Sequence, residues 1–119
     1  MSDNSSRRFD LYLEDMLLSI ERIEEYIKGF DFASFKKNYL VVDAVARNFE
    51  IIGEAAKNIP SEIQVKYPQL PWRKMYGLRN LISHEYFGID YEIIWEIASK
   101  NLPQNKEILI QIIEDLGKK

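Results

Sequence analysis

The sequence predicts an all-α protein, an up-and-down bundle of four to five main helices with short connections. Apolar residues recur at spacings of three and four along most of the 119 residues, prolines and glycines punctuate these stretches, and no alternating β pattern appears. The chain is 46% apolar and 29% charged, which is typical of a globular domain with a real core. We expect one domain over residues 9–116, after a flexible N-terminus at 1–8 and before a polar tail at 117–119.

The first long helix is predicted to follow this N-terminus and to end near Gly29. Acidic residues separate its apolar positions, so the helix is amphipathic and its acidic face is expected to meet solvent. Asp31 is placed to cap a short apolar turn that follows. The apolar positions are Phe9, Leu13, Met16, Ile20, Ile23 and Ile27.

A second long helix is predicted from about Tyr39 to Ile59, where Pro60 stops it. Its apolar stripe is wide, which indicates a central position in the bundle. Residues 51–57 combine one glycine with two alanines, and these small side chains permit close approach of another backbone.

The polar face of this second helix allows two interpretations. Arg47, Glu50 and Glu54 are spaced three and four apart and therefore share a face. They form surface ion pairs of little energetic value, or Arg47 and Glu54 line the same site as His84. On spacing alone the first interpretation is favoured.

The next helices are predicted from their caps and breakers. Ser61 is expected to cap a short helix that reaches about Tyr67. Pro71 suits the first position of the helix that Trp72 opens, because the missing N–H costs nothing there. Gly77 inside that helix costs about 1 kcal/mol relative to alanine, which suggests close approach of a partner helix or a ligand.

Two further helices are expected in the last third of the chain. Residues 87–88 end the helix begun at Trp72, and Asp90 caps a helix to about Asn101. Pro103 then starts the last helix, which carries an apolar stripe to the C-terminus.

Composition excludes several classes of site. The absence of cysteine removes disulfides and thiolate metal sites, and a single histidine removes a histidine-rich metal site within one protomer, although a carboxylate site for magnesium stays open. The net charge is −3, but residues 36–79 hold eight basic and four acidic side chains and are the part suited to phosphate. No apolar run long enough for a signal peptide or a membrane span appears, so we expect a cytoplasmic protein without a membrane partner.

The only histidine, His84, lies in a polar cluster between Arg79 and Tyr86. On a helix Arg79 and Tyr86 are nearly aligned, Asn80 neighbours His84, and Ser83 falls between the two pairs. Arg79 and His84 are about 140° apart around the axis, so one helix cannot easily hold a short ligand between them. A second copy of the helix would solve that.

These side chains suit chemistry at phosphorus. Arg79 offers a bidentate clamp for phosphate, and His84 can accept and return a proton near neutral pH. Without a metal, such groups suit RNA cleavage in which the 2′-hydroxyl attacks, and a two-fold homodimer would supply the second histidine. The structural alternatives are that His84 binds the last carbonyls of its helix and that Arg79 pairs with Glu85 or Glu50.

Several strings resemble a known family. The segment from Arg79 to His84 resembles the motif of HEPN-domain ribonucleases (higher eukaryotes and prokaryotes nucleotide-binding), and its continuation to Tyr86 resembles the longer motif of HepT-like toxins. The strings at 47–57 and 71–72 and the string at 86–90 are also similar to that subfamily. The resemblance extends over residues 9 to 116.

The resemblance implies a HEPN-like helical homodimer that acts as a metal-independent endoribonuclease toxin with no cofactor. Carried over by position, Arg79 and His84 would be catalytic and Asn80 would support His84. Ser83, Glu54 and Arg47 are further supporting candidates from their places on the helix faces described above. A nucleotidyltransferase antitoxin is the implied partner, and AMP transfer to Tyr86 would block the phosphate clamp. The implied substrate is RNA, with transfer RNA as a candidate. A scaffold or nucleotide-binding subunit without catalysis, docked to the nucleotidyltransferase, is the alternative.

Overall fold

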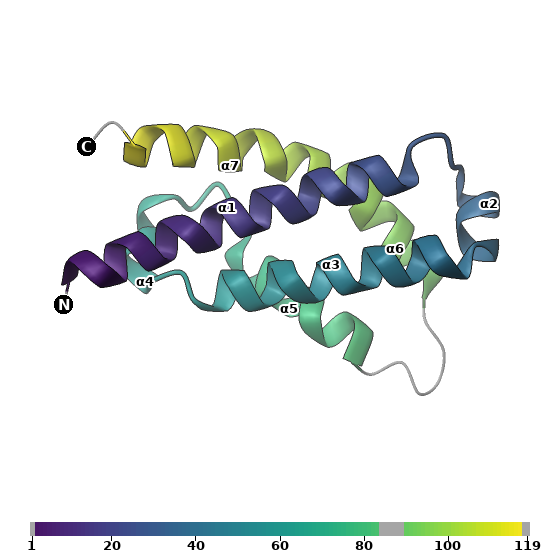
Figure 1. The fold of residues 1–119 in the computed structure, drawn as a ribbon, viewed down its shortest axis with the longest axis horizontal. Coiled ribbons are helices and arrows are strands. Elements are labelled where there is room, and N and C mark those ends of the chain that lie inside the picture. The colour runs from purple at the N-terminus through teal and green to yellow at the C-terminus, as the bar shows by residue number, and fades with distance from the viewer. Residues whose placement is uncertain (1, 84–89, 118–119) are drawn as a thin grey trace.

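The computed structural model describes residues 2–83 and 90–117, and all the elements in these ranges are helical (Figure 1). No strand occurs within them, which confirms the predicted all-α class. The elements are α1 (Ser2–Ile27), α2 (Phe32–Lys37), α3 (Tyr39–Lys57), α4 (Ser61–Lys66), α5 (Trp72–Ser83), α6 (Tyr91–Glu96), the π-helical turn η2 (Ile97–Asn101) and α7 (Leu102–Gly117).

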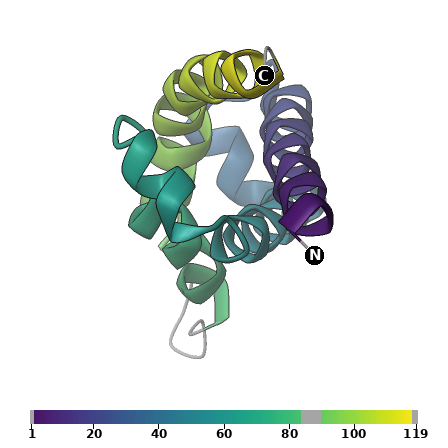
Figure 2. The ribbon, with the colours of Figure 1, turned by 90° about the vertical axis from the view of Figure 1, so that its left-hand side faces the viewer.

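The helix α3 is the centre of the bundle, because it packs against α1 on one side and α5 on the other. The helix α7 lies alongside α1, and the helices form a ring when seen along the long axis (Figures 1 and 2). They enclose a shared apolar core. Side chains of α1, α3 and α7 meet there and are almost fully buried. They include Leu13, Met16, Ile20, Ile23, Val45, Phe49, Ile52, Leu109 and Ile112.

Helix α1 ends where the sequence predicts but begins earlier than predicted. Helix α1 ends at Ile27, and Gly29 follows with φ of +83°, a left-handed conformation that glycine adopts without strain. The predicted end near Gly29 is confirmed. The helix begins at Ser2, however, seven residues before the apolar repeat that starts at Phe9.

Side-chain caps fix α2 and α3 but not α4. The Asp31 carboxylate accepts a hydrogen bond from the Ser34 N–H at 2.8 Å, which confirms the predicted cap, and this bond lowers the pKa of Asp31. Asn38 caps α3 in the same way. The predicted cap at Ser61 is wrong, because Ser61 is already the first residue of α4 and the carbonyl of Pro60 accepts the first helical bonds.

The last helix was predicted to start at Pro103, and α7 begins at Leu102, so this start is confirmed to within one residue, but no gap separates α7 from the preceding helix. Helix α6 continues through η2 into α7, so the path from Tyr91 to Gly117 is helical throughout, although it bends (Figure 1). A proline in a helix lacks an N–H and crowds the preceding turn. The wider turn, in which the Leu102 N–H donates to the Ile97 carbonyl, lies just before Pro103 and accommodates it.

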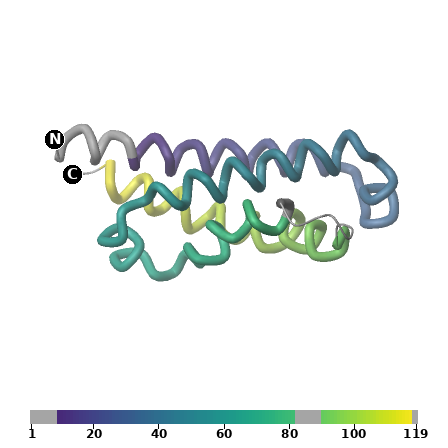
Figure 3. The backbone as a smooth tube through the Cα atoms, turned by 90° about the horizontal axis from the view of Figure 1, so that it is seen from below, coloured from purple at the N-terminus to yellow at the C-terminus, as the bar shows by residue number. Residues whose placement is uncertain are grey.

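Two polar contacts hold α7 to the bundle. The ammonium of Lys106 lies 2.8 Å from the carboxylate of Glu24 on α1, and this contact raises the pKa of Lys106. The hydroxyl of Tyr67 donates to the carboxylate of Asp115, and this hydrogen bond raises the pKa of Tyr67 because it stabilises the neutral phenol. The long helices α1 and α3 run side by side over most of the molecule's length (Figure 3).

Within the residues that the structure describes, no helix combines the length and the apolar character needed to cross a bilayer.

Candidate functional site

The site is built on the contact between α3 and α5, which Gly53 makes possible. A β-carbon added at Gly53 would lie 2.8 Å from the backbone nitrogen of Arg79 and 2.9 Å from the carbonyl oxygen of Tyr76. A real side chain cannot approach backbone atoms so closely, so only glycine fits at this crossing. The predicted close approach of another backbone to residues 51–57 is confirmed, and the backbone is that of Arg79.

Among the described residues, Glu54 and Tyr76 contact the side chain of Arg79. Its guanidinium Nη1 lies 3.1 Å from Oε2 of Glu54 on α3, and its Cζ lies 5.8 Å from the centre of the Tyr76 ring on α5. The Arg79 side chain is 35% exposed and that of Glu54 is 56% exposed, so the ion pair contributes at most about 1 kcal/mol to folding. Its main effect is to hold the guanidinium at the surface in one orientation.

Arg79 and Glu54 lie at a polar cleft of about 530 Å³ between α1, α3 and α5, here called the arginine cleft. Arg47 lines the same cleft, with its Nη1 3.9 Å from Oε1 of Glu50. Arg47 and Glu54 thus line one cleft with Arg79, but His84 lies outside the described residues, so a site that they share with His84 stays a prediction. The contact between the exposed side chains of Arg47 and Glu50 agrees with the interpretation as a surface ion pair. The full lining is Tyr12, Asp15, Arg47, Glu50, Ile51, Glu54, Ala55 and Arg79.

Tyr12 and Asp15 were not predicted as site residues. They belong to α1, whose acidic face the sequence interpretation left to solvent. Their proximity to Arg79 depends on the rotation of α1 against α3, which the amphipathic pattern specifies only coarsely. Although the cleft has three carboxylates, the described chain contains no group of three acidic or histidine side chains that could hold a metal ion.

The other predicted site residues are placed less fully. Asn80 is exposed on α5, and Ser83 is the last residue of that helix. His84 and Tyr86 lie outside the described residues, as does Glu85, the alternative partner for Arg79. The pairing of Asn80 with His84 and the roles of His84 and Tyr86 stay predictions.

A buried polar residue on α3 was also missed. Asn48 is 4% exposed, and its side-chain amide donates to the Ala44 carbonyl at 2.9 Å. Its Oδ1 has no hydrogen-bond donor among the described residues. Buried acceptors are nearly always paired, so an unpaired Oδ1 is unusual. Asn48 follows Arg47, which lines the arginine cleft, in the sequence. Asparagine in a predicted central helix was the available signal.

Comparison with known proteins agrees on one family. Residues 16–112 match the family model described as "Ribonuclease HepT-like". The chain is 38% identical over 113 residues to the protein named "Putative RNase MJ0125" of Methanocaldococcus jannaschii, covering 95% of this chain and 97% of that protein. It is 40% identical over 95 residues to "Probable ribonuclease HepT" of Thermococcus cleftensis, covering 80% and 86% of the two chains.

A third relative is a longer protein. The chain is 42% identical over 108 residues to "Gamma-glutamylcyclotransferase and putative RNase MJ0434" of Methanocaldococcus jannaschii, which covers 91% of this chain but spans only about half of that relative. No solved structure matches this structure at a significant level.

Proposed function

Because the chain belongs to the HepT-like ribonuclease family, we propose that it is a ribonuclease toxin that cuts RNA at a site shared by two protomers. The observation that carries the proposal is the arginine cleft, where Glu54 holds Arg79 at the surface on the helix that leads into His84. A cation held at the surface five residues before the expected proton-transfer group in the sequence suits stabilisation of a phosphodiester in its transition state.

The proposed reaction needs no metal. His84 of one protomer removes the proton from the ribose 2′-hydroxyl, whose oxygen then bonds to phosphorus. The bond from phosphorus to the 5′-oxygen breaks, and the partner's His84 protonates the leaving oxygen. Arg79 neutralises the charge that grows on the two non-bridging oxygens. The products are a 2′,3′-cyclic phosphate and a 5′-hydroxyl.

The charges that line the arginine cleft favour a substrate that contacts the protein through a few phosphates. Arg79 and Arg47 offer cations to phosphate, whereas Asp15, Glu50 and Glu54 in the same cleft repel a long anionic backbone. A structured RNA that presents one exposed phosphodiester satisfies both conditions, and transfer RNA is the candidate.

Control by a nucleotidyltransferase completes the proposal. AMP transferred to Tyr86 would add an anion near Arg79 in sequence and occupy the phosphate clamp. The protein would then be inactive as long as Tyr86 carried the nucleotide. An intact mass measurement reads this state directly, because each AMP group adds a fixed mass to the chain.

The first test is cleavage of bulk transfer RNA in EDTA by purified protein whose mass shows no nucleotide on Tyr86. We expect cleavage by the wild type and by Arg22→Ala, which alters an exposed arginine on α1. His84→Ala and Arg79→Ala are each expected to lower the rate at least about 100-fold.

Expression in cells separates the enzyme from the scaffold alternative. If expression harms growth and His84→Ala removes the harm without dissociating the protein, catalysis is the cause. If His84→Ala is as harmful as the wild type, the proposal fails and a scaffold that docks the nucleotidyltransferase is favoured.

A further inference from the structure

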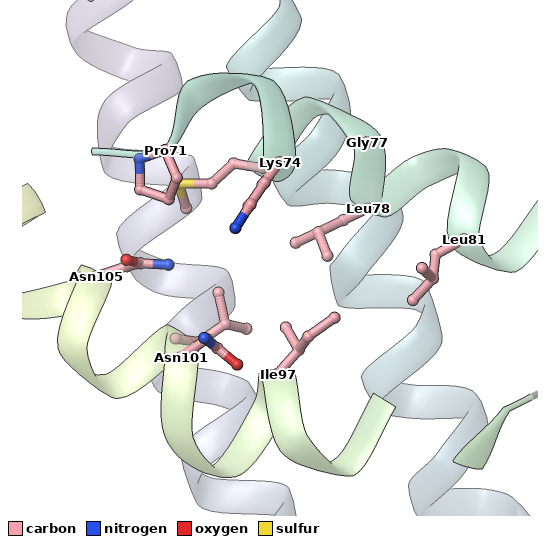
Figure 4. A pocket seen from close by; sticks show the side chains of 10 residues that line it. Pro71, Lys74, Gly77, Leu78, Leu81, Ile97, Asn101 and Asn105 are labelled. Carbon is pink, nitrogen blue, oxygen red and sulfur yellow. The ribbon is translucent and has the colours of Figure 1, made fainter. Parts of the chain in front are cut away.

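A second cavity, here called the α5 groove, lies between α5 and the segment formed by η2 and α7 (Figure 4). It has a volume of about 470 Å³, within the range of small-molecule sites. Its surface is mostly apolar, with Leu78 on α5 facing Ile97 on η2. It uses a different face of α5 from Arg79, which lines the arginine cleft.

Three polar side chains converge on this apolar groove. Lys74 of α5, Asn101 of η2 and Asn105 of α7 point their polar ends into it (Figure 4). Within the described part of the chain, none of the three makes an ion pair or a side-chain hydrogen bond. One ammonium and two amide groups are thus available to a ligand, in a setting whose walls are apolar.

The backbone of both walls is unusual. Gly77 lines the groove, and a β-carbon added there would meet nothing within 4 Å. No packing contact among the described residues therefore explains a glycine that weakens the helix, in contrast to Gly53. The opposite wall is the π-helical turn η2, and such turns inside α-helices are frequent at functional sites.

We propose that the α5 groove binds a small amphipathic anion, with its apolar body against Leu78 and Ile97 and its acidic group at Lys74 and Asn105. The positive charge of Lys74 selects an anion, because the described lining of the groove contains no acidic residue to neutralise it. Amide donors of the two asparagines complete the coordination of the acidic group.

A matched pair of probes tests the proposal. The fluorescent anion 8-anilinonaphthalene-1-sulfonate and the neutral N-phenyl-1-naphthylamine share the aromatic body and differ in the sulfonate. We expect the anion to bind the full chain with one site per protomer by calorimetry. Lys74→Met should weaken its binding about tenfold and leave binding of the neutral probe within about twofold. Lys57→Met, on the exposed end of α3, should change neither.

A second variant locates the site. In Gly77→Leu the added β-carbon meets nothing within 4 Å and the longer side chain projects from the groove wall, so we expect the variant to retain the helical circular dichroism of the wild type and to lose binding of both probes. Unchanged affinity of the anion in Lys74→Met, or of both probes in a folded Gly77→Leu, would overturn the proposal. A third outcome would also overturn the proposal: neither probe binds the wild type, and Gly77→Leu without ligand sediments at a lower mass than the wild type. The groove would then be covered by another chain, which the leucine displaces.

Discussion

Glu54 and Glu50 share the arginine cleft, but of these two carboxylates it is Glu54 that lies at ion-pair distance from Arg79, whereas Glu50 contacts Arg47. Glu54→Ala removes the carboxylate that orients the guanidinium. We predict that its kcat for RNA cleavage falls about tenfold, equivalent to about 1.4 kcal/mol of transition-state stabilisation.

The matched control is Glu50→Ala, which removes a carboxylate from the same cleft and a weaker contact with Arg47 at 3.9 Å. Its kcat should stay within about twofold of the wild type. A positioning role also predicts that the KM of Glu54→Ala changes little, because the loss appears mainly in the transition state. Equal losses in the two variants would contradict the assignment of Glu54 to Arg79.

Asn48 offers a second matched comparison on α3. Asn48→Asp replaces the amide that donates to Ala44 and leaves two buried acceptors without a donor. We predict a loss of at least about 2 kcal/mol in the free energy of unfolding, measured in urea at pH 7.

Asn58 makes the same kind of bond to the carbonyl of Glu54 at 2.9 Å but is exposed, so Asn58→Asp should cost less than about 1 kcal/mol. If Asn48→Asp is as stable as the wild type, a donor or cation must reach Oδ1, and Asn48 would then belong to the functional site.

Glycine has opposite consequences on the two central helices. Gly53→Ala places a β-carbon 2.8 Å from the Arg79 backbone, so α5 must shift away from α3. Gly77→Ala meets nothing within 4 Å and improves helix propensity. We predict that the first variant loses about 1–3 kcal/mol of unfolding free energy and that the second gains up to about 1 kcal/mol.

Thermal and urea denaturation of the two variants measure both effects, and RNA cleavage adds a second readout. Because Gly53 sets the position of Arg79, Gly53→Ala should also lose activity at a temperature where it is still folded. A Gly53→Ala variant with wild-type stability and activity would show that the contact between α3 and α5 does not fix the cleft.

The elements show how far the sequence determines the fold. Apolar periodicity was sufficient to predict the helix from Tyr39, which ends at Lys57, two residues before the predicted end at Ile59. The cap at Asp31 was predictable because it acts within its own turn, whereas the cap at Asn38 was not predicted. The start of the last helix at Pro103 was predicted to within one residue, but the π-helical turn that joins it to α6 without a gap was not, because nothing local in the sequence distinguishes such a turn from a separate helix start.

The candidate site was predictable only in part from the sequence. Arg79, Glu54 and Arg47 were identified as candidates from spacing within their helices and from the resemblance of the motif. Their convergence required α3 to cross α5 at Gly53, which the cluster of small residues suggested. Tyr12 and Asp15 were missed because tertiary packing sets which residues of α1 face the cleft.

At the scale of the whole molecule, the proposed mechanism requires two chains, since each supplies one histidine. We predict that sedimentation gives a mass of about 28 kDa at micromolar concentration, twice the 14.1 kDa of one chain. His84→Ala should sediment as the wild type does. RNA cleavage by a protein that remains monomeric at the assay concentration would contradict the shared site.

The most direct test of the central claim is the chemistry of the cleaved RNA ends. Transfer RNA treated with the unmodified protein in EDTA is predicted to yield 2′,3′-cyclic phosphate and 5′-hydroxyl ends, identified by mass spectrometry, and His84→Ala should yield neither. A 5′-phosphate end, cleavage that stops in EDTA, or undiminished cleavage by His84→Ala would contradict metal-free attack by the 2′-hydroxyl at Arg79 and His84.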